Sequence, residues 1–116
     1  MITMYGIPNC STVKKARDWL ALHGCTVRFH DFKKDGVPPE QLAQWLKQIP
    51  LERLINRKSS TWRTLTEEAR QAAVKPEGAR TLLLAHPTLI KRPVLEHQDK
   101  VYVGFDESQY SMVLSS

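Results

Sequence analysis

The sequence predicts an α/β fold built on a four-stranded mixed sheet with helices on its faces. A strand–helix–strand pattern occupies residues 2–30, apolar residues at helical spacing fill the middle, and a hairpin pattern followed by a helix closes the chain. The predicted order is β-α-β, a helical insert over about 38–86, and β-β-α. At 116 residues the chain has the length of one domain, so we expect a single domain over residues 1–116.

The N-terminal segment has the pattern of a βαβ unit. Residues 2–5 are strand-forming types, and residues 26–30 alternate as a second strand does. Between them Ser11 or Thr12 offers a helix cap, and Gly24 is typical of a helix end. Apolar residues recur at helical spacing within that helix: Val13, Ala16 and Leu20. Such a unit places its two strands in parallel, with a right-handed crossover.

The middle of the chain is predicted to be helical, apart from a polar loop at 56–61. Helical patterns cover 40–49 and 51–55 and begin again near Thr66 and Pro76. After residue 93, the strand patterns are separated by a turn of three or four residues. These strands are 94–95 and 101–103, and Asp106 then caps a final helix with Gln109 three residues on.

Composition favours a soluble protein with an anionic ligand. Hydrophobic residues make up 41% and charged residues 25%, and 17 basic residues against 12 acidic ones give a net charge of +5. The basic residues are scattered and no nucleic-acid-binding signature accompanies them, so we do not expect nucleic acid as a partner. No apolar run approaches membrane-spanning length and no secretory signal is present, so we expect a cytoplasmic protein without membrane contact.

Two cysteines raise the question of thiol chemistry. Cys10 lies between the first strand and the first helix, where free N–H groups and the helix dipole favour a reactive thiolate. The alternative is that Cys10 is a small buried hydrophobe, and for Cys25 that alternative is preferred. A helix of fourteen residues separates its ends by roughly 20 Å, beyond disulfide reach. A Cys10–Cys25 redox pair is therefore not expected, and no zinc-ligand spacing is present.

Two arginines are candidates for binding an anion beside the thiol. Arg57 lies in the polar segment, among donors suited to an oxyanion. Arg92 stands directly before Pro93, and a peptide bond that precedes proline can be cis.

These features occur in segments that together resemble the arsenate reductase (ArsC) family, in the branch that holds YffB-type proteins and Spx regulators. The segments that carry the resemblance are 5–12, 56–58, 86–87, 90–94 and 104–107. The resemblance implies a thioredoxin-like fold, with Cys10 as nucleophile and with Arg57 and Arg92 holding the oxyanion and the ionised cysteine. It also implies that Pro93 is cis and that the adjacent backbone pairs with a peptide-like ligand such as glutathione.

The sequence departs from the family pattern at three positions. Gly6 stands where the arsenate reductases have a histidine, and Gly104 where they have a third arginine. Both departures weaken arsenate recognition, since such an anion needs several charge-assisted donors. Val13 stands where redox-sensing Spx proteins have a second cysteine, so an external thiol must resolve any disulfide at Cys10.

We therefore expect a glutathione-dependent thiol reductase that forms a mixed disulfide at one cysteine. The expected partners are glutathione as co-substrate and an oxidised thiol or glutathione mixed disulfide as substrate. We expect a monomer with no metal and no bound cofactor. Two alternatives stay open: a weak arsenate reductase, and a non-enzymatic Spx-like regulator that docks on a protein partner. The expected catalytic residues are Cys10, Arg57 and Arg92, and the expected substrate-binding residues are Asn9, Lys91 and Pro93.

Overall fold

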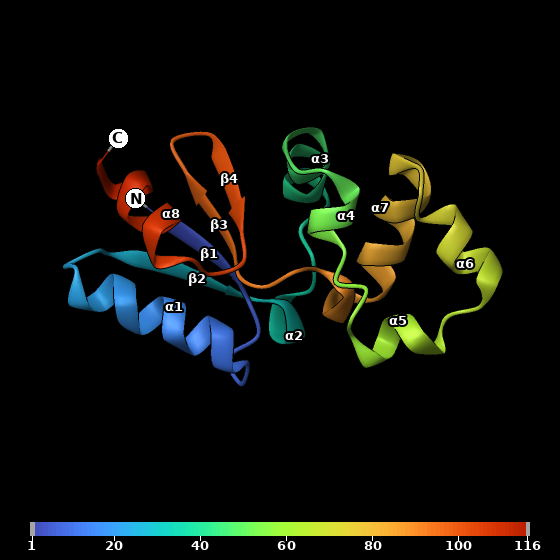
Figure 1. The fold of residues 1–116 in the computed structure, drawn as a ribbon, viewed down its shortest axis with the longest axis horizontal. Helices are drawn as coiled ribbons and strands as arrows, with labels where there is room; N and C mark the ends of the chain where they lie inside the picture. Colours follow the sequence, from blue (N-terminus) through green and yellow to red (C-terminus); the bar gives the residue numbers. More distant parts are fainter. Residues whose placement is uncertain (1, 116) are drawn as a thin grey trace. The chain divides into compact units, whose positions relative to one another are not determined.

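A computed structural model describes residues 2–115, which form two compact units. The first contains residues 2–32 and 92–115 and holds the sheet, whereas the second contains residues 33–91 and is helical (Figure 1). The chain passes from the first unit to the second within the short helix α2 (Phe32–Asp35). A single domain over residues 1–116 stays a prediction.

The first unit is built on the mixed sheet that the sequence predicts. Its strands are β1 (Ile2–Gly6), β2 (Val27–Asp31), β3 (Val94–His97) and β4 (Lys100–Val103), in the order β2-β1-β3-β4. β1 pairs in parallel with β2 and antiparallel with β3, which in turn pairs antiparallel with β4. The parallel pair needs a crossover, and α1 (Ser11–Leu22) provides it.

The core of the first unit lies between one face of the sheet and two helices, α1 and α8 (Glu107–Ser115). Alternation along β1 turns Ile2 and Met4 toward this core. The spacing of Val13, Ala16 and Leu20 builds one buried stripe on α1. The remaining members come from β3 and α8: Leu95, Tyr110 and Val113. Full burial of a side chain of this size contributes about 2 kcal/mol, so this face fixes α1 on the sheet.

The hairpin turn is shorter than the sequence pattern suggests. Only Gln98 and Asp99 lie between β3 and β4, with φ of 51° and 64°. Positive φ at both central residues is the mark of a type I′ turn, whose twist matches that of the flanking strands. The predicted turn of three or four residues was wrong because His97 pairs with Lys100 as part of the ladder. The second strand likewise runs over Val27–Asp31 rather than 26–30.

The second unit contains more helices than the sequence pattern predicts. The predicted helices appear as α3 (Pro39–Gln48), α4 (Leu51–Leu54), α6 (Glu67–Ala72) and α7 (Pro76–Ala85). The helices not predicted are α2, α5 (Ser60–Thr64) and the 3-10 helix η1 (Pro87–Leu89). Within residues 2–115, no helix is both long and apolar enough to cross a membrane.

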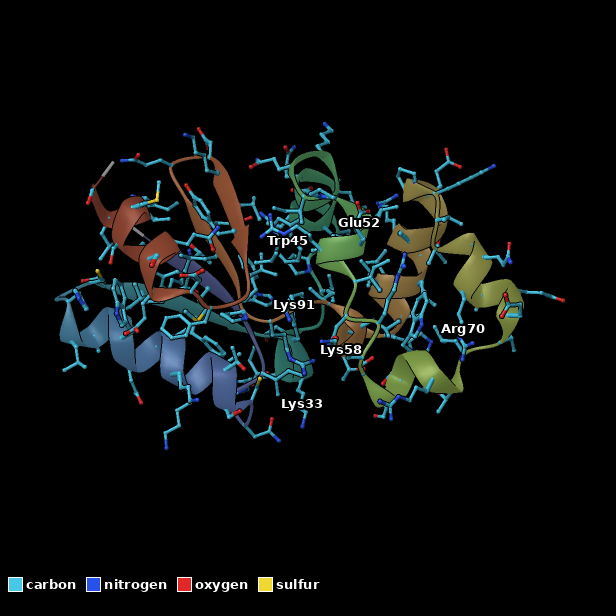
Figure 2. The ribbon with its side chains drawn as sticks, in the orientation of Figure 1. Lys33, Trp45, Glu52, Lys58, Arg70 and Lys91 are labelled. Carbon is cyan, nitrogen blue, oxygen red and sulfur yellow. The ribbon has the colours of Figure 1, made fainter. Side chains whose placement is uncertain are left out.

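Helix α5 corrects the prediction of a polar loop at 56–61. The side chain of Ser59 caps α5 by accepting a hydrogen bond from the Trp62 backbone N–H at 3.2 Å. Arg70, labelled in Figure 2, donates to the carbonyls of Trp62 and Arg63 at 3.3 and 2.9 Å. These contacts hold a short helix whose residues lack an apolar stripe, which is why periodicity did not reveal it.

Candidate active site

Cys10 is the N-cap residue of α1. Its backbone is extended, with φ −92° and ψ 127°, while its carbonyl accepts the first helical hydrogen bond from Lys14 N–H at 3.0 Å. Its own N–H donates to the Ile7 carbonyl at 3.2 Å, which closes the turn after β1. The prediction of Ser11 or Thr12 as the cap was wrong, because the helix begins at Ser11 and leaves the cysteine in the capping position.

The surroundings of Cys10 favour its ionised form. The neutral thiol makes no capping hydrogen bond, but the amides of Val13 and Thr12 face the sulfur and stabilise a thiolate. Burial raises the pKa of Cys10, whereas the Val13 N–H, the Arg92 guanidinium and the Thr12 N–H lower it. The lowering contributions prevail, and the pKa of Cys10 falls below that of an ordinary cysteine.

Arg92 and Pro93 reach Cys10 from the start of β3. Arg92 is half-buried, and its guanidinium both donates a hydrogen bond to the sulfur and attracts the thiolate charge. The Arg92–Pro93 peptide bond is cis, as the resemblance implies. The carbonyl of the buried Pro93 accepts a hydrogen bond from the Gly104 N–H at 2.9 Å, which ties this segment to the end of β4. Asn9 precedes the cysteine in the exposed turn.

Packing explains the glycine at position 6. A Cβ atom added to Gly6 would lie 2.9 Å from Cγ2 of Val13, and Val13 is fully buried. A histidine at position 6 therefore requires Val13 to shift or to change.

Backbone conformation explains the glycine at position 104. Gly104 has φ of +78°, a region that side chains other than glycine rarely adopt. Packing at position 6 and backbone conformation at position 104 thus each favour glycine at the two positions.

The two remaining site candidates belong to the second unit. Arg57 is exposed, and its guanidinium carbon lies 5.6 Å from the centre of the Trp62 ring. Lys91 is exposed too, and its N–H donates to the Leu54 carbonyl at 2.7 Å. This hydrogen bond and an isolated β-bridge between Ile55 and Ile90 show that segments 54–56 and 89–91 lie side by side. Lys91 is labelled in Figure 2. The roles of Arg57 and Lys91 stay predictions.

The second cysteine lies in a different environment. Cys25 is partly buried against the core of the first unit, and its thiol donates a long hydrogen bond of 3.8 Å to the His23 carbonyl. Both cysteines are free thiols. Among residues 2–115, no group of three His, Cys, Asp or Glu side chains gathers to hold a metal ion.

Sequence reasoning expected free N–H groups at the start of the first helix but did not identify which two amides face the sulfur. Side chains at an N-cap accept hydrogen bonds from the N–H groups two and three positions on. With Cys10 as cap, these are the N–H groups of Thr12 and Val13. Placing the cap one residue earlier would have identified both.

Comparison with known proteins supplies the family. The model of the ArsC family matches residues 5–113. This chain belongs to the ArsC family. The solved structure of a YFFB protein is 38% identical, covers 98% of this chain and 99% of its own, and superposes with a TM-score of 0.92. This agreement confirms the predicted thioredoxin-like fold and the resemblance to the YffB-type branch.

Two further relatives of this chain carry names that refer to different activities. An arsenate reductase (ArsC) related protein from Brucella melitensis is 47% identical, with 99% of this chain and 95% of that chain covered and a TM-score of 0.74. The global transcriptional regulator Spx of Streptococcus pyogenes is 25% identical over 99% of this chain and 86% of its own length. The relatives of this chain therefore include a protein named as arsenate-reductase-related and a protein named as a regulator.

Proposed function

We propose that this ArsC-family protein is a thiol–disulfide reductase that uses Cys10 as its single nucleophile and glutathione as co-substrate. The observation that carries the proposal is the position of Cys10 at the start of α1, facing two backbone amides and the Arg92 guanidinium. A thiol held this way is ionised at lower pH than an ordinary cysteine, and the thiolate is the form that attacks disulfides. The reducing cytoplasm is the proposed compartment, with the protein acting as a monomer.

The proposed reaction has two thiol–disulfide exchanges. The Cys10 thiolate attacks the glutathione sulfur of a mixed disulfide, the S–S bond of the substrate breaks, and the substrate leaves as a thiolate that takes a proton. A second glutathione, as its thiolate, then attacks the glutathione sulfur bound to Cys10. Oxidised glutathione leaves and the Cys10 thiolate is regenerated. The substrate gains two electrons, which the two glutathione molecules supply.

The proposed ligand contacts follow from charge. Glutathione carries two carboxylates, which Arg57 and Arg92 would hold through charge-assisted hydrogen bonds. Lys91 and Asn9 are further candidates for contact, and the backbone beside the cis Pro93 would pair with the tripeptide. No step of the proposed exchange requires a metal ion or a prosthetic group.

Turnover of a glutathionylated peptide tests this proposal. With reduced glutathione, NADPH and glutathione reductase, each released substrate thiol is matched by one NADPH oxidised. Cys10→Ser is expected to abolish turnover and Cys25→Ser to keep it, while Arg92→Ala is expected to lower kcat/KM about tenfold, for the loss of one charge-assisted contact. Turnover that survives Cys10→Ser would contradict the proposal.

A regulator that docks on a protein is the second candidate, because a relative carries the name Spx. Because Val13 stands at the position of the second cysteine, a CxxC redox switch is absent, but this absence does not argue against docking on a partner. An affinity-tagged protein would separate the classes, since a regulator retains one partner in stoichiometric amount from lysate and a reductase does not. If the Cys10→Ser protein has no reductase activity and still retains that partner, the result would favour the regulator.

A further inference from the structure

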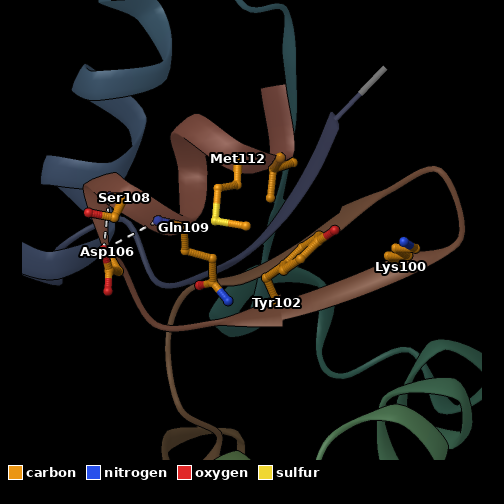
Figure 3. A pocket seen from close by; sticks show the side chains of 7 residues that line it. Lys100, Tyr102, Asp106, Ser108, Gln109 and Met112 are labelled. Atoms are coloured by element: carbon orange, nitrogen blue, oxygen red, sulfur yellow. Dashed lines mark hydrogen bonds between the residues drawn. The ribbon is translucent and has the colours of Figure 1, made fainter. Parts of the chain in front are cut away.

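A pocket in the first unit is formed by β4 and α8 together with Asp106, which lies between them (Figure 3). Its volume is about 510 Å³, within the range that holds small organic ligands. It is lined by Lys100, Tyr102, Asp106, Ser108, Gln109, Met112 and Val113. None of these residues takes part in the proposed chemistry of Cys10.

The body of the pocket is apolar. The Tyr102 ring rises from β4, and Met112 faces the pocket from α8 (Figure 3). Met112 is 74% exposed, so its side chain is accessible to a ligand instead of being buried in the core. A flexible thioether opposite an aromatic ring adapts well to a flat ligand, because sulfur and ring both contact aromatic groups favourably.

The charged groups lie at opposite ends of the pocket. Asp106 and Ser108 lie at one end and Lys100 at the other (Figure 3). The Asp106 carboxylate already accepts hydrogen bonds from the Ser108 and Gln109 N–H groups, at 2.8 and 3.3 Å. Within the part of the chain that the structure describes, the Lys100 ammonium forms no ion pair. The Lys100 ammonium is therefore available to a ligand at the end of the pocket opposite Asp106.

We propose that this pocket binds a planar aromatic molecule with a single anionic group. The ring system lies between Tyr102 and Met112, and the anion lies beside the Lys100 ammonium. The Tyr102 hydroxyl is a second donor near that end. A second negative charge at the far end of the ligand is disfavoured by Asp106. This binding is independent of the thiol and of the proposed reductase activity.

The probe for this site is 1-anilinonaphthalene-8-sulfonate, whose fluorescence rises on entering an apolar site, with the uncharged N-phenyl-1-naphthylamine as its matched partner. The sulfonate is expected to bind saturably with one site per chain. Lys100→Gln is expected to weaken it about fivefold, the loss of one exposed ion pair, and to leave the uncharged probe unchanged. Met112→Gln is expected to weaken both probes. Lys15→Gln, an exposed lysine on α1, and Cys10→Ser are the controls and are expected to change neither affinity.

Three results would overturn the proposal. The first is the absence of saturable binding of either probe by the folded protein. The second is sulfonate affinity that is equal in wild type, Lys100→Gln and Met112→Gln, since the probe would then occupy another surface. The third is amide chemical-shift change on probe addition that falls outside residues 100–113. Only variants whose melting temperature equals that of the wild type are compared, so that loss of the fold is not mistaken for loss of the site.

Discussion

Replacing Arg92 by alanine is expected to change the pH dependence of Cys10 alkylation and not merely its rate. A hydrogen bond to a charged group contributes about 1.5–3 kcal/mol when buried. Because Cys10 is only partly buried, solvent screening reduces this to about 1 kcal/mol. That energy corresponds to about fivefold less thiolate at a pH below the pKa of the thiol. The remaining thiolate is more basic and therefore more nucleophilic, which recovers about a factor of two.

The two rate profiles are therefore expected to cross. At low pH the variant reacts about two- to threefold more slowly than the parent, and near pH 10, where both thiols are ionised, it reacts about twofold faster. Iodoacetamide is the reagent, since it has no charge for Arg92 to attract, and intact mass follows the product. Cys25→Ser serves as the parent so that one thiol reacts, and Lys15→Ala is the matched removal of an exposed cation. Superimposable profiles, or an equal slowing at every pH, would refute thiolate stabilisation by Arg92.

Three more predictions concern the packing of one helix and the positions near Cys10 at which the sequence departs from the family pattern. Gly78→Ala is expected to lower the free energy of unfolding by about 2 kcal/mol in urea denaturation, since its Cβ would lie 1.9 Å from the Ala72 carbonyl oxygen; Thr81→Ala on the same helix is the control. Val13→Cys in the Cys25→Ser protein is expected to restore a CxxC pair, so that mild oxidation removes two daltons and the thiol count falls to zero. The rate of arsenate reduction with glutathione and glutaredoxin is expected to be on the order of a hundredfold below that of a dedicated arsenate reductase, because two charge-assisted contacts are lost. A comparable rate would contradict the expectation that Gly6 and Gly104 weaken arsenate recognition.

The fold could be predicted from the sequence where apolar periodicity is strong. The stripe of Val13, Ala16 and Leu20 and the alternation along β1 each specify one buried face, and the order of elements follows from them. Local signals were weaker guides. The cap of α1 was missed because serine and threonine are better caps than cysteine in general, whereas the turn after β1 brings the extended residue one position earlier.

The candidate site could be predicted only in part. The sequence predicts that Cys10 precedes a helix and shows that Arg92 precedes a proline, and the structure brings the two side chains together. In the fold, the two-residue length of the hairpin turn at Gln98 and Asp99 was not predicted, because neither residue is glycine although both adopt positive φ. The pocket beside α8 was not predicted either, since its lining comes from two elements that have no shared sequence pattern.

The most direct test of the central claim is the intact mass of the protein after treatment with oxidised glutathione. A single-thiol mechanism predicts one adduct of about 305 Da, attached at Cys10, absent in Cys10→Ser and retained in Cys25→Ser. An internal Cys10–Cys25 bridge, by contrast, predicts a loss of two daltons and equal sensitivity to either serine. That second result, or the absence of any adduct on the folded wild-type protein, would contradict Cys10 as a nucleophile resolved by an external thiol.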